Sequence, residues 1–259
     1  MTTHWNAGVY DAVGKPQAAW AARLIDDLKL VGNEIVMDAG CGSGVVTLEL
    51  AERLPQGRIY AVDSSSEMIE GLKAKMASGK TGCEIVPILS SLTETILPEQ
   101  VDVVFSNAVF HWILDDEGLF GNLFRLTRPG GRIRAQCGGA GNLGRLYQVI
   151  KSVQQVPPFN QFFHGFYDAK KYRSESEASA SLEQAGWKHV RTQLFQQPVE
   201  FDARDACTFM RHVIVRDHMP LLPEELRQAY VDKIVEFEIA RHGKPFVADY
   251  VRLDIWADR

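Results

Sequence analysis

Residues 38–44 are Asp-Ala-Gly-Cys-Gly-Ser-Gly. They follow a short, mainly apolar stretch, residues 34–38, that is typical of a buried strand. Glycines in such a loop allow a sharp turn and let a ligand approach the main chain, because no Cβ stands in the way. The next residues, 45–54, have the pattern of a helix. A loop between strand and helix at the carboxyl edge of a parallel sheet is where nucleotide-like ligands bind. The stretch therefore predicts an α/β fold with a ligand site.

The spacing of these glycines narrows the kind of ligand. It is G-x-G-x-G, because Val45 occupies the position of the last glycine in the dinucleotide motif, and no Lys-Ser/Thr pair follows as in a P-loop. Asp63 ends the next strand, where an acid accepts hydrogen bonds from ribose hydroxyls. Two plainer interpretations stay open: a tight turn that needs glycine only for its dihedrals, and an acid that stabilises a helix N-terminus.

Strands and helices alternate outward from this loop. We expect strands at residues 34–38, 58–63, 84–88, 101–106, 132–137, 189–195 and 251–257, and helices at 16–30, 45–54, 64–78, 116–128, 142–155 and 174–185. Capping boxes are expected at Ser64 to Glu67 and at Ser174 to Glu177. Pro129-Gly130-Gly131 should end the helix at 116–128, and Gly186 suits the left-handed position after the helix at 174–185. A helical block at 203–240 precedes the last strand. Short apolar strands of this kind favour a parallel sheet with helices on both faces.

Composition limits the class of protein. The chain has 259 residues, 46% hydrophobic and 24% charged, with a net charge of −5, so we expect a globular protein without a dedicated nucleic-acid surface. The four cysteines lie far apart and none has C-x-x-C spacing, while no signal peptide or membrane-length apolar run is visible. We therefore predict a cytoplasmic protein, monomeric or homodimeric, with no membrane partner. His212 and His218 are six residues apart and do not share a helix face, so no metal site is predicted.

The motifs together resemble the class I S-adenosylmethionine-dependent methyltransferases. They are DAGCGSG at 38–44, AVDSSSEM at 61–68, VVFSNAVFHW at 103–112 and LTRPGGRI at 126–133. The whole-chain layout, with Trp5-Asn6 before Tyr10 and the sequence 250–253, is similar to the branch that contains trans-aconitate methyltransferase. The resemblance implies a Rossmann-like seven-stranded sheet with an antiparallel last strand and a helical cap insertion. It also implies a single domain over 1–259, with a lid and helix at 1–30, a cofactor core at 34–137, a substrate-side cap at 138–250 and a closing strand at 251–257.

The resemblance also assigns roles to matched positions. The residues expected to bind S-adenosylmethionine are Asp38, Gly40, Cys41, Gly42, Gly44, Asp63, Ser64, Met68, Ser91, Leu92, Asn107, Tyr10 and Gln17. Among them, Asp38 would orient the methionine amino group, Asp63 would bind the ribose, and Gln17 would reach the methionine carboxylate. One departure stands out: many family members carry an acid after the third strand that binds adenine, and the matching residues here are Ser90-Ser91-Leu92.

The chemistry of the transfer singles out further residues. Methyl transfer is an in-line displacement, and the enzyme contributes mainly alignment. A carboxylate acceptor needs no base, whereas a phenol, alcohol or carbon acid does. His111 is the candidate base, with a hydrogen-bonding role as the alternative. Candidate substrate-binding residues are Trp5, Trp112, Arg145, Arg211 and His212, since tryptophans wall pockets and arginines bind carboxylates bidentately.

These observations lead to three hypotheses. The first is a small-molecule methyltransferase that acts on an organic acid or similar metabolite by O-methylation, with C- or N-methylation as alternatives. The second is a nicotinamide-dependent Rossmann oxidoreductase, which the missing last glycine disfavours. The third is a sensor that binds the cofactor without turnover, because cofactor binding and catalysis are separable.

Overall fold

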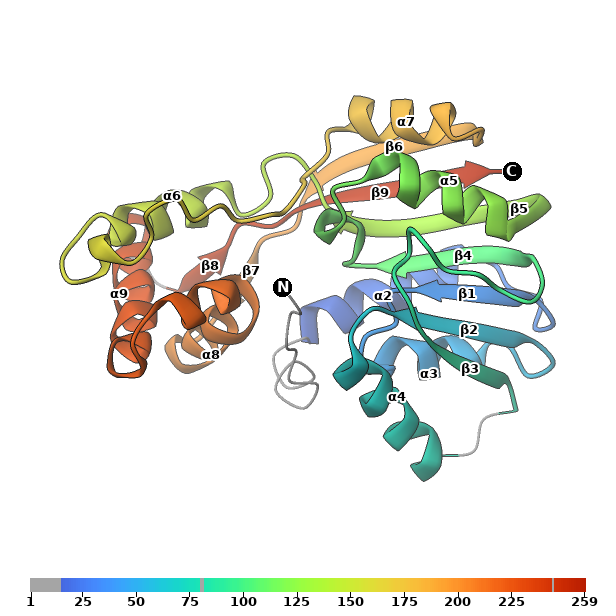
Figure 1. Cartoon of the computed structure of the whole chain (residues 1–259), viewed down its shortest axis with the longest axis horizontal. Coiled ribbons are helices and arrows are strands. Elements are labelled where there is room, and N and C mark those ends of the chain that lie inside the picture. The colour runs from blue at the N-terminus through green and yellow to red at the C-terminus, as the bar shows by residue number, and fades with distance from the viewer. Residues whose placement is uncertain (1–14, 80–81, 244) are drawn as a thin grey trace. The chain divides into compact units, whose positions relative to one another are not determined.

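In the computed structural model, which describes residues 15–79, 82–243 and 245–259, seven strands of the described chain form one sheet in the order β3-β2-β1-β4-β5-β9-β6 (Figure 1). These strands are β1 (Ile35–Ala39), β2 (Arg58–Asp63), β3 (Glu84–Leu89), β4 (Val101–Asn107), β5 (Thr127–Gly138), β6 (Lys188–Gln196) and β9 (Val251–Asp258). The first five strands pair in parallel, and β9 pairs antiparallel with β5. The Rossmann-like seven-stranded sheet with an antiparallel last strand is confirmed.

Helices cover both faces of this sheet, as Figure 1 shows. One face packs on α2 (Lys15–Asp27), α3 (Val45–Glu52) and α4 (Ser66–Ser78), and the other on α5 (Asp116–Leu126) and α7 (Glu175–Gln184). The central strands β1, β2, β4 and β9 are mostly buried because they lie between the two helical layers, whereas the edge strand β6 has no buried residue. The helices therefore fix the carboxyl edge of β1, β2 and β4, where the candidate site is formed.

The chain divides into two compact units. Unit 1 comprises residues 1–140, 170–194 and 252–259, and unit 2 comprises 141–169 and 195–251. Unit 2 contains α6 (Gly144–Gln154), η2 (Phe159–Gln161), α8 (Ala203–Phe209), a π-helical turn (η3, Met210–Ile214), η4 (Arg216–Leu221) and α9 (Glu224–His242). It also contains β7 (Val199–Phe201) and β8 (Phe246–Ala248), an antiparallel pair that the sequence analysis missed. The helical block at 203–240 is confirmed, and its role as a cap stays a prediction.

Two helix boundaries differ from expectation. The helix cap of α4 is Ser65, whose Oγ accepts the N–H of Met68 at 3.3 Å, so the S-x-x-E spacing from Ser64 is one residue early. The helix expected at 116–128, which is α5, ends at Leu126, because Thr127 is already extended and pairs with Val101. Pro129-Gly130-Gly131 therefore lies inside the span of β5, where the ladder is irregular. The capping box at Ser174 to Glu177 and the positive φ of Gly186 are confirmed.

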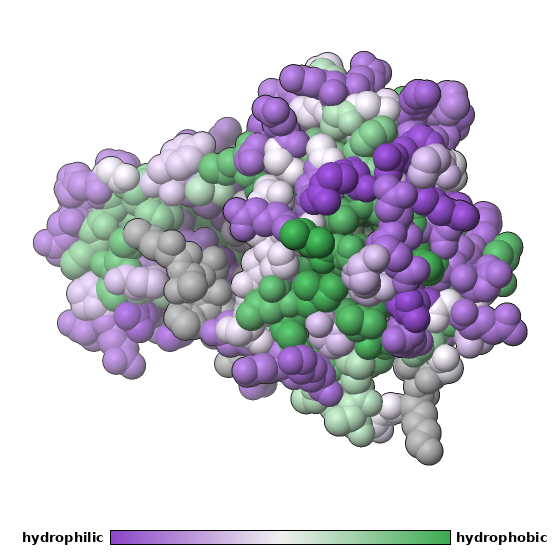
Figure 2. All heavy atoms as spheres, turned by 45° about the vertical axis from the view of Figure 1, so that its right-hand side comes forward, coloured by the Kyte–Doolittle hydropathy of each residue, from purple (hydrophilic) through white to green (hydrophobic). Residues whose placement is uncertain are grey.

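The surface is mainly hydrophilic, with apolar atoms gathered over part of the face shown in Figure 2. Among the described residues, no helix combines the length and apolarity needed to cross a membrane. Cys41, Cys83, Cys137 and Cys207 are all free thiols.

Candidate active site

The loop after β1 is held against the end of β2 by main-chain hydrogen bonds. The N–H groups of Gly40 and Cys41 both donate to the carbonyl of Val62, at 2.8 and 3.0 Å. Gly40, Gly42 and Gly44 all have positive φ, which explains the glycine at each position. A Cβ at Gly40 would lie 2.2 Å from Val109 Cγ2, whereas one at Gly42 would meet no described atom within 4 Å. The loop is therefore packed at Gly40 and open at Gly42.

Asp63 joins this loop to the start of α4. Its Oδ2 accepts the N–H of Gly42 at 3.0 Å and its Oδ1 accepts the N–H of Ser65 at 2.9 Å. Burial raises the pKa of Asp63, and the backbone donors, Ser65 and Gly42 among them, oppose that rise. These two hydrogen bonds use part of the roughly four acceptor positions of a carboxylate. Asp63 thus orders the loop while keeping capacity for hydroxyl donors.

Asp38 lies beneath the loop and is 2% exposed. Thr47 Oγ1 donates to its Oδ2 at 2.7 Å. Burial raises the pKa of Asp38 to about 7, the Thr47 hydrogen bond lowers it, and the charge of Asp63 raises it further. Cys41 is also buried, and burial raises the pKa of its thiol far above the usual range. The thiolate that nucleophilic chemistry requires is therefore not available at Cys41.

Further residues expected to bind the cofactor follow β2 and β3: Ser64 comes directly after β2, Met68 lies in the first turn of α4, and Leu92 comes after β3. Ser64 is exposed, whereas Met68 is 3% exposed and Leu92 is 5% exposed. The Ser91 hydroxyl shares a hydrogen bond with Thr93 Oγ1 at 2.8 Å. The N–H of Ser90 donates to the carbonyl of Asp63, which joins the end of β3 to the end of β2.

Asn107, His111 and Trp112 follow β4 at the same edge. Asn107 is the last residue of β4, and His111 and Trp112 lie in the short 3-10 helix η1 (Phe110–Trp112). The His111 ring is 8% exposed, and its Nδ1 accepts the N–H of Gly138 at 3.3 Å. The Lys170 ammonium lies over the Trp112 ring, 4.9 Å from its centroid.

The charges of two buried arginines, Arg252 and Arg173, and of the half-buried Lys170 act on His111. Arg252 is 2% exposed; its Nε donates to Gln136 Oε1 at 3.2 Å, and its guanidinium lies 4.3 Å from the centroid of Trp20. Arg173 is 1% exposed and pairs with Asp116. Burial and the charges of Arg252, Lys170 and Arg173 hold the pKa of His111 well below its usual range. His111 is therefore neutral at physiological pH.

Three of the proposed substrate residues lie in unit 2. Arg145 pairs with the buried Glu238 at 3.0 Å, and its N–H donates to Asp249. Arg211 donates to Gln228 at 3.0 Å from the π-helical turn. Burial, with the charge of Arg211, lowers the pKa of His212. Arg145 thus has a structural partner inside its own unit, and the substrate roles of all three stay predictions.

Trp5 and Tyr10 lie outside the described residues. The backbone of Gln17 is part of α2, but its side chain is outside what the structure describes. Their proposed contacts with the cofactor or substrate therefore stay predictions.

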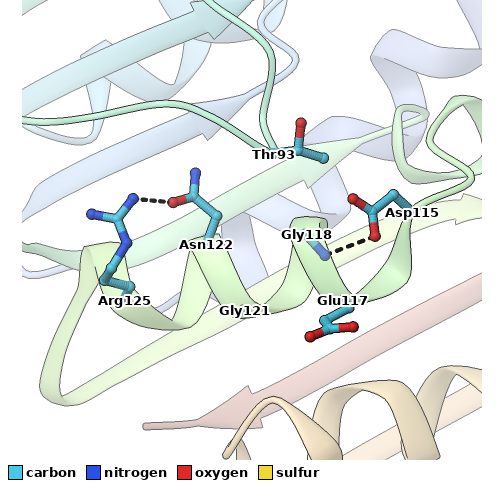
Figure 3. A pocket seen from close by; sticks show the side chains of 7 residues that line it. All are labelled: Thr93, Asp115, Glu117, Gly118, Gly121, Asn122 and Arg125. Carbon is cyan, nitrogen blue, oxygen red and sulfur yellow. Dashed lines mark hydrogen bonds between the residues drawn. The ribbon is translucent and has the colours of Figure 1, made fainter.

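A separate pocket of about 470 Å³ opens on α5 (Figure 3). Its lining residues are Thr93, Asp115, Glu117, Gly118, Gly121, Asn122 and Arg125. Figure 3 shows that Arg125 bonds Asn122 and that the N–H of Gly118 donates to Asp115. These hydrogen bonds belong to α5 itself, and the lining contains no residue of the glycine loop. Among the described residues, no group of three or more His, Cys, Asp or Glu side chains is placed to bind a metal ion.

The sequence analysis missed several residues of this site. Thr47 bonds Asp38, Ser65 caps α4, and Lys170, Arg173 and Arg252 surround His111. Arg252 carried a visible signal, because it stands with Asp254 among the apolar residues of the last strand pattern. Gly138 carried none, because it acts through a backbone N–H.

The comparisons with known proteins agree with this geometry. Residues 36–131 match the family model described as a methyltransferase domain. The chain is 29% identical over 168 residues to a malonyl-[acyl-carrier protein] O-methyltransferase of Ilyobacter polytropus, covering 64% of this chain and 63% of that protein. It is 26% identical over 266 residues to an uncharacterized methyltransferase of Schizosaccharomyces pombe, covering 96% of each.

A shorter sequence similarity and a similarity in structure were also found. A trans-aconitate 2-methyltransferase of Escherichia coli is 33% identical over 133 residues, which cover 51% of this chain and 50% of that protein. The alignments with the two relatives of named substrate thus span half to two thirds of their length. Among solved structures, the YcgJ protein of Bacillus subtilis superposes with a TM-score of 0.63 at 14% identity, covering 92% of this chain and 97% of that one. That likeness supports the fold.

Proposed function

Because the chain belongs to the class I S-adenosylmethionine-dependent methyltransferases, we propose that it transfers a methyl group to a small-molecule acceptor and that the acceptor is an organic acid methylated on oxygen. The observation that carries the proposal is the junction of the glycine loop, Asp63 and α4. There the main chain is open at Gly42, and a carboxylate stands 3.0 Å from its N–H.

The residues at this edge fit the cofactor. The open side of Gly42 allows a ligand to lie against the main chain, and Asp63 retains acceptor capacity for a ribose diol. Asp38 supplies a buried carboxyl group near the position expected for the methionine amino group. Ser91 takes the place of the acid that many family members use for adenine, and its hydroxyl is oriented by Thr93. When bound, S-adenosylmethionine supplies an electrophilic methyl group on a sulfonium.

Two features support an acid as acceptor. Lys170, Arg173 and Arg252 place positive charge around His111, and positive charge favours an anionic acceptor. Relatives are named for O-methylation of malonyl-acyl-carrier protein and for methylation of trans-aconitate, which both present carboxylates. An acyl group on a carrier protein is therefore an alternative acceptor, as are C- and N-methylation of a small metabolite. We keep Trp112, Arg145, Arg211 and His212 as proposed substrate contacts.

The free thiols of all four cysteines are consistent with a reducing compartment, and we propose the cytoplasm. A monomer or homodimer is proposed for the assembly.

Calorimetric titration with S-adenosylhomocysteine tests the cofactor, with NAD and NADP titrated in parallel. We expect micromolar binding of S-adenosylhomocysteine only. A preference for the nicotinamide cofactors would overturn the proposal. Methyl transfer is then tested with methyl-labelled S-adenosylmethionine and panels of carboxylic acids, phenols and amines. Cofactor binding without transfer to any panel or to extract would favour a sensor instead.

A further inference from the structure

The imidazole of His111 is held from several directions. It is 8% exposed, and its centroid lies 5.2 Å from that of Trp112 and 5.7 Å from that of Tyr172, with which it stacks. Its backbone carbonyl accepts the N–H of Lys171 at 2.8 Å. The ring is thereby confined in position and in plane.

The hydrogen bond from Gly138 determines where the proton of this ring lies. A backbone N–H can only donate, so Nδ1 presents its lone pair to Gly138. The neutral ring therefore carries its proton on Nε2. Among the side chains that the structure describes, which leave out those of residues 15–19 and 203, Nε2–H has no hydrogen-bond partner. A hydrogen-bond donor without a partner in the described part of the chain is available to a ligand, and this observation points to a contact between Nε2–H and an acceptor group.

This arrangement opposes a role as general base. A neutral ring protonated on Nε2 accepts a further proton only at Nδ1, and Nδ1 faces Gly138. The resulting imidazolium would also lie in the field of Lys170, Arg173 and Arg252. The Asp116 carboxylate, which could offset that charge, is bonded by Arg173 and Lys171. The geometry and the charges both favour a permanent donor.

We propose that His111 is a specificity-determining hydrogen-bond donor, which gives its Nε2–H to a carboxylate of the methyl acceptor. The inference rests on the proposed function, and it restricts the substrate class to acceptors that arrive ionised. Phenols, alcohols and carbon acids need a base, which His111 does not supply. A carboxylate is already ionised near neutral pH and gains from a donor and from nearby cations.

The chemical step then balances without proton transfer. A lone pair of the carboxylate oxygen forms the new O–C bond, while the bond from sulfur to the methyl carbon breaks. Its electron pair stays on sulfur, and the carboxylate becomes a neutral methyl ester. The Nε2–H holds the carboxylate in line for this displacement and keeps its own proton.

The tautomer can be tested without any acceptor. Side-chain ¹⁵N NMR of the full chain, with the His111→Gln variant for assignment, should show His111 as the neutral Nε2–H tautomer from pH 5.5 to 8. A His111 that titrates near its usual pKa of about 6.5, or that carries its proton on Nδ1, would overturn the proposal. This measurement stays decisive even when the protein binds no S-adenosylhomocysteine, so it separates failure of this inference from failure of the proposed function.

Turnover supplies the second test, with labelled S-adenosylmethionine at saturation and the acid panel as acceptors. His111→Gln retains a donor but no base, and we expect kcat/KM within about 3-fold of wild type. His111→Ala should lose about 10- to 100-fold, mostly in KM for the acid, because a hydrogen bond to a charged group is lost. The matched control His189→Gln changes an exposed histidine on β6 and should leave turnover unaltered.

The pH profile distinguishes donor from base. With a donor, kcat at saturating cofactor stays flat between pH 6 and 9, because the acid is ionised throughout. His111→Gln should keep that flat profile. A wild-type profile that rises near pH 6–7 and disappears in His111→Gln, or an acceptor range confined to phenols or amines, would contradict the proposal.

Discussion

The carboxylate of Asp63 accepts the backbone N–H of Gly42 at 3.0 Å, and this one hydrogen bond ties the end of β2 to the glycine loop after β1. The other oxygen accepts the N–H of Ser65 at the start of α4. Asp63 therefore sets the conformation of the loop as well as offering acceptors to a ligand. Its substitution should affect both properties, and the two effects can be measured separately.

Asp63→Ala should weaken binding of S-adenosylhomocysteine about 10- to 100-fold, which corresponds to about 1–3 kcal/mol for lost polar contacts. Asp63→Asn keeps one acceptor oxygen, so its affinity for S-adenosylhomocysteine should lie between those of Asp63→Ala and wild type. Calorimetric titration measures the affinities, and Glu52→Gln on the exposed end of α3 is the control. Unchanged affinity in a folded Asp63→Ala protein would remove Asp63 from the ribose role.

Gly42→Ala and Gly40→Ala should fail in different ways. At Gly42 the added Cβ meets no described atom within 4 Å, so the variant should fold with a cost of about 1–2 kcal/mol for a left-handed alanine. Its cofactor affinity should fall sharply, because the Cβ occupies the open side of the loop. At Gly40 the Cβ would lie 2.2 Å from Val109 Cγ2, so the free energy of unfolding should drop by about 2–5 kcal/mol.

Chemical denaturation and calorimetry together check this contrast. Gly42→Ala should lose cofactor affinity with only a small loss in the free energy of unfolding. Gly40→Ala should show the larger loss in the free energy of unfolding. If Gly42→Ala bound S-adenosylhomocysteine as tightly as wild type, the ligand would not approach the loop at this residue.

The sequence predicted the cofactor edge well, because its determinants are local. β2 has the expected bounds, 58–63, and Asp63 stands at its end, because a short apolar run and the polar residues that follow it are both visible in a short window. The cap of α4 was displaced by one residue because of a local contact that the S-x-x-E spacing does not record. Asp63 bonds the N–H of Ser65, which places Ser65 rather than Ser64 at the cap, and S-x-x-E spacing contains no information about that contact.

The surroundings of His111 could not be predicted in the same way. Gly138 is 27 residues away and acts through its main chain, which has no residue signature. Arg252 lies 141 positions after His111 in the chain, and its charge reaches the ring only because β9 pairs with β5. The start of β5 at Thr127 likewise depends on pairing with Val101 in β4. The surroundings of His111 and the start of β5 are thus determined by long-range strand pairing, which local sequence patterns do not record.

The stability of the protein should depend on pH through Asp38, because burial raises its pKa to about 7. The native state then holds a proton that the unfolded state releases near pH 3.8. Stability from this group is fully present below pH 3.8 and is lost as pH rises through about 7, by about 3–5 kcal/mol in total. The Asp38→Asn variant cannot ionise at this position and should lack that loss.

Urea unfolding at pH 5 and pH 8 tests the difference. Other carboxylates contribute equally to both proteins, so the wild-type change minus the Asp38→Asn change isolates Asp38. An identical change in the two proteins would show that Asp38 is ionised across the range. If the amino group of S-adenosylhomocysteine stabilises the ionised form of Asp38, binding near pH 7 should release a proton. Calorimetric titration in two buffers of different ionisation enthalpy measures this release.

Asp254 anchors a buried charge network between β5 and β9, and its loss should cost more than any surface pair. Its side chain is fully buried; Oδ2 lies 3.2 Å from Arg134, and Oδ1 accepts Gln136 Nε2 at 2.6 Å. Asp254→Ala leaves the buried Arg134 guanidinium with less compensation, so the free energy of unfolding should fall by about 3–5 kcal/mol. Lys233→Ala removes an exposed pair with Glu236 and should cost under about 0.5 kcal/mol.

The double variant Arg134→Met with Asp254→Leu shows whether the loss comes from uncompensated charge. Removing both charges replaces the pair with apolar side chains, so part of the stability lost in Asp254→Ala should return. Urea denaturation of the four proteins gives the comparison. A double variant at least as unstable as Asp254→Ala would mean that pairing of Arg134 with Asp254 is not the source of the stability. The hydrogen bonds of Gln136 with Asp254 and with Arg252, which both connect β5 to β9, would then be what stabilises the fold.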